Sequence, residues 1–95
     1  AEGDEAAEAR FSIGQAFQSM AQYRKAIESY YKVSYHGADS SAMWVTSVDY
    51  RRAQCYEQLT EYGQAAKVYQ RIVQREGSDS AFGRGALERL NLLPN

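Results

Sequence analysis

Apolar residues recur with the period of an α-helix in two stretches of the chain, residues 23–33 and 62–72. Their intervals of three and four residues place them along one face of a helix. The residues that share this pattern are Tyr23, Ala26, Tyr30 and Val33, followed at one constant interval by Tyr62, Ala65, Tyr69 and Ile72. A fixed interval of this size indicates a repeat built from supersecondary units. The alanine between two tyrosines predicts a close helix crossing, with tyrosine hydroxyls at the edge of the core.

The same periodicity predicts five helices, over residues 2–20, 23–35, 41–59, 62–75 and 81–92. The turns at 21–22 and 60–61 are so short that the helices they join must be antiparallel. The last helix would cover the apolar face of the second pair, which an array of stacked helices needs at its end. The chain is therefore predicted to be all-α, with a first repeat at about 5–38, a second at about 41–77 and a capping helix at about 80–92.

Helix ends follow from local residue chemistry. Gly37 is expected to end the second helix in a left-handed conformation. Ser40 or Ser41 is expected to cap the third helix, with Asp39 as a competitor for that role, and Ser80 begins the last helix. The apolar stripe of the first helix is expected to start at Phe11 or Ile13 and to continue through Ala16, Phe17 and Met20.

Length and charge exclude several classes of protein. Ninety-five residues make one small domain, residues 1–95. The formal net charge of −1 argues against nucleic-acid binding, which needs a clustered basic field. No apolar run reaches the roughly 20 residues of a membrane span, so direct membrane insertion is not expected. The start of the chain lacks an apolar signal core and a Met, which favours a domain cut from a longer protein.

Candidate chemistry is sparse, and no enzymatic activity, cofactor or metal site is predicted. His36 is the single histidine and precedes a loop glycine, with nothing that places it beside a nucleophile. Cys55 lies within a predicted helix and is expected to be a small packed or partly exposed residue rather than a reactive thiol. No cysteine and histidine cluster has the spacing of a zinc site. The residues Gly83, Arg84 and Gly85 are too few for a phosphate loop and indicate close packing or a weak last helix.

The repeated pattern resembles the tetratricopeptide repeat, a helix–turn–helix unit of about 34 residues. Its small and aromatic positions fall on Gly14, Phe17, Ala26, Tyr30 and Val33 in the first repeat, and on Ala53, Tyr56, Ala65, Tyr69 and Ile72 in the second. The resemblance implies a right-handed α-solenoid that binds proteins without catalysis.

Four features depart from the family pattern. The usual turn glycine is Ala21 in the first repeat and Thr60 in the second, and a usual leucine of the second repeat is Arg52. The loop proline is absent, and the interval is about five residues longer than the standard unit. The extra residues are expected to lengthen the start of the third helix, near residues 42–45.

The resemblance also implies a concave groove for an extended protein or peptide partner. The family's groove positions fall on Glu8, Phe11, Gln15, Gln18, Ser19, Ser47, Tyr50, Gln54, Glu57 and Gln58. The residues expected to bind the partner are Phe11, Gln15, Gln18, Tyr50, Gln54 and Glu57, with the two rings as anchors. This set contains no lysine or arginine clamp, so capture of a terminal carboxylate is not expected.

Three further alternatives concern the surface and the setting of the domain. Trp44 either packs over the second helix or forms an exposed anchor for a partner. Self-association into a homo-oligomer, as an assembly element, is the alternative to peptide binding. Residues 68–80 and 86–91 are similar to the C-terminal ends of repeat domains in bacterial envelope proteins, above all the one attached to the Tol–Pal system. That similarity implies a periplasmic location, with the cytoplasm as the alternative.

Overall fold

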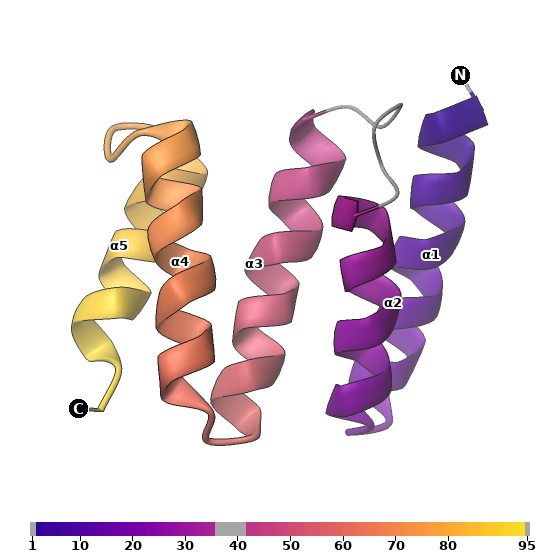
Figure 1. Ribbon diagram of the computed structural model, residues 1–95, viewed down its shortest axis with the longest axis horizontal. Helices are drawn as coiled ribbons and strands as arrows, with labels where there is room; N and C mark the ends of the chain where they lie inside the picture. Colours follow the sequence, from indigo (N-terminus) through magenta and orange to yellow (C-terminus); the bar gives the residue numbers. More distant parts are fainter. Residues whose placement is uncertain (1, 36–41, 95) are drawn as a thin grey trace.

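The computed structural model describes residues 2–35 and 42–94, and over these residues the chain forms five α-helices (Figure 1). They are α1 (Glu2–Ser19), α2 (Tyr23–Tyr35), α3 (Ala42–Gln58), α4 (Tyr62–Glu76) and α5 (Ala81–Leu92). The prediction of an all-α fold of two helix pairs and a final helix is confirmed, and each helix lies within a residue or two of its expected bounds.

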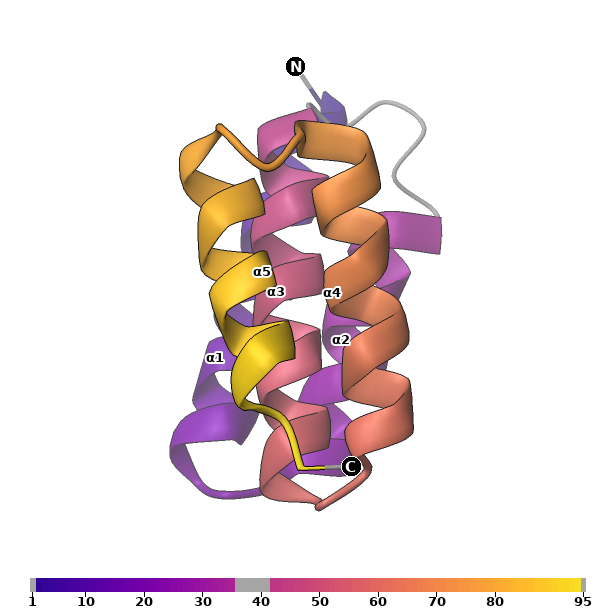
Figure 2. The ribbon, with the colours of Figure 1, turned by 90° about the vertical axis from the view of Figure 1, so that its left-hand side faces the viewer.

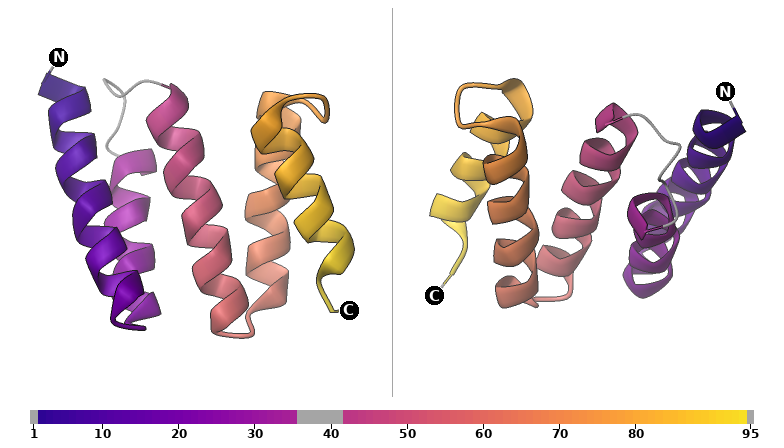
Figure 3. Two further views of the ribbon diagram at one scale, coloured as in Figure 1. Left: turned by 180° about the vertical axis from the view of Figure 1, so that it is seen from behind. Right: turned by 45° about the horizontal axis from the view of Figure 1, so that its top comes forward.

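Each helix packs mainly against its neighbours in the chain, and the five helices form two layers. Seen from behind, α1, α3 and α5 stand side by side, with α2 and α4 in the layer beyond them (Figure 3, left). The helices α1 and α5 therefore stand at opposite ends of the array. Viewed from the α5 end, α4 and α5 stand side by side in front of the remaining helices (Figure 2).

Both helix pairs close through the same turn, although neither turn contains the glycine that the family usually has there. Ala21 and Thr60 adopt left-handed backbone angles, with φ of 60° and 58°. The next residue donates its backbone N–H five residues back, from Gln22 to Phe17 and from Glu61 to Tyr56, at 2.9 Å in each case. A left-handed non-glycine residue costs about 1–2 kcal/mol, which packing of the two helices must offset. The repeat found in the side chains thus holds in the backbone as well.

The core is organised around a tyrosine of the second helix in each pair. Tyr30 and Tyr69 have no exposed surface, and neither do the alanines Ala26 and Ala65 one turn before them. Gly14 of α1 lies so close to Tyr30 that a Cβ at position 14 would stand 2.3 Å from the ring. The predicted close crossing between helices is confirmed, and the Tyr30 ring leaves no room for a Cβ at position 14.

The apolar residues of α1 do not form the single stripe that the sequence suggested. Phe11 and Phe17 pack against the core cluster shared with α2 and α3. Ile13 and Met20 point outward, with 51% and 56% of their surface exposed. The expectation was wrong for these two residues because, among the helices that the structure describes, α1 packs only against α2 and α3, and neither covers its outer face.

Arg52, which replaces the family's leucine, is buried with 4% of its surface exposed. Its guanidinium lies 3.7 Å from the carboxylate of Asp49 and 5.2 Å from the ring centre of Tyr31. Asp49 also accepts a hydrogen bond of 3.1 Å from Arg75 of α4. A buried charge is tolerable only with such a partner, so Arg52 depends on Asp49, which Arg75 also links to α4.

The last helix begins as the sequence predicted. The Ser80 hydroxyl accepts a hydrogen bond of 2.9 Å from the backbone N–H of Gly83. A Cβ at Gly83 would lie 1.6 Å from the carbonyl oxygen of Gly77, which supports the close-packing interpretation of the two glycines in α5. The expectations for His36, Gly37, Asp39, Ser40 and Ser41 lie outside the described residues.

We expect Gly14→Ala to destabilise the fold by about 1–3 kcal/mol, because the new methyl group would displace the buried Tyr30 ring. Gly63→Ala is the matched control, since a Cβ at that helical position meets no atom within 4 Å. There the substitution should stabilise by about 0.5–1 kcal/mol. Urea unfolding of both variants measures the two effects. Equal stability of the two variants would contradict the proposed crossing.

Candidate functional site

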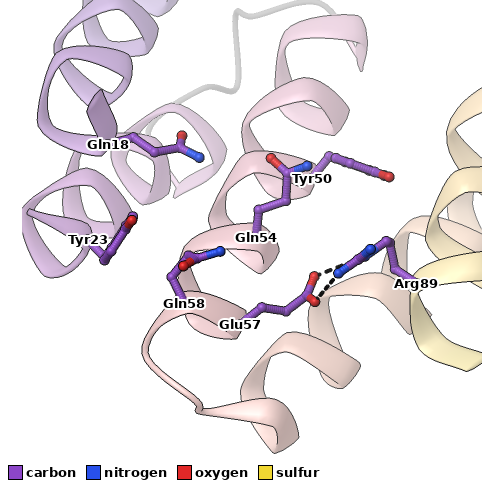
Figure 4. A pocket seen from close by; sticks show the side chains of 7 residues that line it. All are labelled: Gln18, Tyr23, Tyr50, Gln54, Glu57, Gln58 and Arg89. Atoms are coloured by element: carbon purple, nitrogen blue, oxygen red, sulfur yellow. Dashed lines mark hydrogen bonds and ion pairs between the residues drawn. The ribbon is translucent and has the colours of Figure 1, made fainter. Parts of the chain in front are cut away.

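A polar groove of about 540 Å³ opens between α1, α3 and α5. Its walls carry amides, phenol rings and one ion pair, drawn in Figure 4. The lining residues are Gln18, Tyr23, Tyr50, Gln54, Glu57, Gln58 and Arg89. Three helices and the start of α2 thus contribute to one concave surface.

The third helix supplies most of this surface. Tyr50, Gln54, Glu57 and Gln58 succeed one another at intervals of four, three and one, which places them on one face of α3. Tyr50 is fixed by aromatic contacts behind the groove, with its ring centre 5.6 Å from that of Tyr69 in an edge-on arrangement. The side chains of Gln54 and Gln58 point into the space between α1 and α5 (Figure 4).

Each repeat ties a groove side chain to its core tyrosine. The hydroxyl of Tyr30 donates a hydrogen bond of 2.8 Å to the Oε1 atom of Gln18. The hydroxyl of Tyr69 donates to Glu57 in the same way, at the corresponding positions of the second repeat. Burial raises the pKa of Tyr30 to about 12, although the nearby Arg51 acts in the opposite direction. Burial also raises the pKa of Tyr69 well above its usual value, and the hydrogen bond to Glu57 adds to the increase.

Arg89 of α5 completes the site by binding Glu57. Its Nη2 atom forms an ion pair with Oε1 of Glu57, and its Nε atom donates a hydrogen bond of 3.3 Å to Oε2 (Figure 4). The hydrogen bonds to Glu57 raise the pKa of Arg89 further above its already high value. Because both carboxylate oxygens are occupied, the pair is bidentate and adds no net charge to the groove.

The residues predicted to bind a partner occupy two different positions. Gln18, Tyr50, Gln54 and Glu57 line the groove, whereas Phe11 and Gln15 do not belong to its lining. The Phe11 ring instead packs between helices, 5.8 Å from the centre of Tyr30 and 5.4 Å from that of Trp44. Both Phe11 and Trp44 are half-buried. Trp44 thus packs edge-on against α1, within the cluster that α1, α2 and α3 share.

Sequence reasoning missed Arg89 and Tyr23 as groove residues. Ala86 is a buried small residue of α5, as Gly14 and Ala53 are of the earlier helices. An aromatic follows three residues after each of those two positions, and in α5 that position holds Arg89. Neither of the two aromatics, Phe17 and Tyr56, lines the groove, so the repeat pattern gave no signal for Arg89.

Other chemistry finds little support in the part of the chain that the structure describes. Over residues 2–35 and 42–94, no group of three histidine, cysteine or acidic side chains could hold a metal ion. Cys55 is buried, and burial raises the pKa of its thiol to about 11, which leaves it protonated near neutral pH. None of the described helices combines the length and the apolar character of a membrane span.

Comparison with known proteins identifies both repeats. Residues 7–35 and residues 47–77 each match a family model described as the tetratricopeptide repeat, and together the two matches cover more than half of the chain. No curated protein and no solved structure shows significant similarity to the chain.

We expect the contribution of Cys55 and Tyr30 to the free energy of unfolding to be fully present below about pH 9 and to be lost between about pH 9 and 12. Cys55 ionises near 9.0 when unfolded and near 11 when folded, and Tyr30 near 10.0 and 12, respectively. The folded chain therefore holds these protons more tightly, and that contribution is lost as the pH rises through the folded values. Urea unfolding across this pH range should show that the free energy of unfolding falls less steeply with pH for Tyr30→Phe than for the wild type. An equally steep loss in that variant would contradict the assignment.

Proposed function

Because the chain belongs to the tetratricopeptide repeat family, whose repeats generally mediate protein–protein interactions, we propose that its polar groove binds an extended segment of a partner protein. The observation that carries this proposal is the composition of the groove. Four of its seven lining residues, Gln18, Tyr50, Gln54 and Glu57, are residues predicted to bind the partner, and a fifth, Gln58, is a predicted groove position.

The amide side chains suit the main chain of an extended peptide. Each glutamine side chain offers a carbonyl acceptor and an NH₂ donor, which can pair with the N–H and the C=O of a peptide bond. The Oε1 atom of Gln18 is held by Tyr30, so its NH₂ group remains to donate. Gln54 and Gln58 add two more amides on the facing helix. Because packed helices already fix these positions, little ordering entropy is lost on binding.

The charge of the groove selects against a strongly charged segment. Arg89 is a cation in the groove, but Glu57 occupies it through two contacts. A partner carboxylate would have to displace Glu57 and leave that carboxylate beside Tyr69 without its cation. The free energy lost by breaking the ion pair between Glu57 and Arg89 would be about as large as the free energy gained from the new one. The proposed ligand is therefore an uncharged extended segment, and its affinity should depend little on salt.

We further propose a bacterial cell envelope location, in the periplasm, as part of a larger protein. The support is the similarity of residues 68–80 and 86–91 to the ends of repeat domains of that kind, including the one attached to the Tol–Pal system. Fractionation of the cells that make the native protein is the check. We expect it in the periplasmic fraction, and recovery with the cytoplasmic proteins alone would reject this location.

A peptide that binds the intact chain is first selected from a displayed random library. We expect the double variant Gln54→Ala/Gln58→Ala to bind this peptide more weakly. Two lost hydrogen bonds correspond to about 1–3 kcal/mol, or roughly 5- to 150-fold in Kd. The measurement is calorimetric titration of that peptide at low and high salt.

The double variant Gln64→Ala/Gln74→Ala is the control for this experiment. It makes the same change at two exposed positions of α4, in the other helix layer. Equal weakening in both double variants, or none in either, would count against binding in the groove.

A further inference from the structure

The outer face of α1 is apolar and exposed. Ile13 and Met20 are exposed by 51% and 56%, and the alanines at positions 6, 9 and 16 are exposed as well. These five residues follow one another at intervals of three and four, so they form one stripe along the helix. The helix α1 stands at one edge of the array, beside α3 and at the opposite end from α5 (Figure 3, left). We call these five residues the α1 stripe.

The chain contains a second copy of this face, and there it is covered. The two equivalent turns align the repeats, with Thr60 in the place of Ala21. The residues of α3 that correspond to the α1 stripe are Val45, Val48, Arg52, Cys55 and Leu59. Val48 and Cys55 have no exposed surface, and Arg52 has 4%. Both apolar residues belong to the core cluster formed with α2, the helix that precedes α3 and packs against it.

Charge indicates what kind of helix fits the uncovered face. The helix α2 is amphipathic, and its charged residues are Arg24, Lys25, Glu28 and Lys32, three of them basic. The first half of α1 is acidic, and the side chains of Glu5 and Glu8 are exposed beside the stripe. A basic amphipathic helix would therefore bury the stripe and neutralise these carboxylates.

We propose that the α1 stripe docks an amphipathic helix of a partner protein, with a basic polar face, in the place on α1 that α2 occupies on α3. The internal repeat supplies the geometry, and the exposed acidic residues supply the charge preference. This docking surface lies outside the polar groove, so it is independent of the function proposed for the groove.

The test uses the sequence of α2 itself as the probe. A copy of residues 23–39 is joined ahead of residue 1 of the intact chain. Each copied residue then stands at the same distance in sequence from the turn at Ala21 as its original does from the turn at Thr60. Because the copied helix is linked to the chain that it should bind, its effective concentration is high. Even a weak interaction with the α1 stripe should therefore be detected. We expect the extended chain to unfold at a higher urea concentration than the native chain, with its copied segment resistant to trypsin.

The variant Ile13→Glu distinguishes docking from a general effect of the extension. In the extended chain it should raise the unfolding equilibrium constant roughly tenfold more than in the native chain. The variant Ser19→Glu adds the same charge at an exposed position of α1 outside the stripe, and its effect should be equal in both chains. A copied segment that trypsin removes, or an Ile13→Glu effect equal in both chains, would overturn the proposal.

Sedimentation of the native chain tests the other occupant of the surface. We expect a monomer at all concentrations. A dimer that Ile13→Glu dissociates would show that a second copy covers the α1 stripe, and it would overturn the assignment to a partner helix.

Discussion

The structure depends on the burial of one tyrosine between the two helices of each repeat. Tyr30 and Tyr69 are fully buried, which for a ring of this size contributes a few kilocalories per mole each. Such a residue must satisfy its hydroxyl, and it does so by donating to a side chain of the preceding helix, Gln18 or Glu57. The same contact that closes the core therefore also positions the floor of the groove. Packing and binding surface cannot vary independently in this chain.

A single difference between the repeats then makes the groove asymmetric. Gln18 is neutral and needs no further partner, whereas Glu57 is a carboxylate with 12% of its side chain exposed. A carboxylate so placed needs a cation, and Arg89 of α5 provides it. The last helix is consequently held to the array by a polar contact on the groove side as well as by apolar packing behind it. The helix that the sequence identifies as a cap is thus also one wall of the site.

The sequence predicts the parts of this molecule that depend on local periodicity. The stripe from Tyr62 to Ile72 repeats that from Tyr23 to Val33, and the turns between helices allow only antiparallel pairing. Contacts between helices distant in the chain were beyond that reasoning. Arg89 approaches Glu57 because α5 packs on α4 and also contacts α3. Phe11, expected in the groove, turns toward Trp44 because the long α3 brings that ring against α1.

Periodicity also fails at the edge of the array, where the two repeats differ in what lies next to them. Position for position, Arg52 and Asp49 of α3 correspond to Ile13 and Arg10 of α1. A buried arginine needs a carboxylate partner. A neighbouring helix that leaves either of the two charges unpaired would therefore bind unfavourably. Ile13 carries no such restriction, since an apolar side chain needs only a complementary surface. The covered face of α3 therefore restricts its neighbour, whereas the face of α1 that no described helix covers is apolar, as the proposed docking of a separate helix requires.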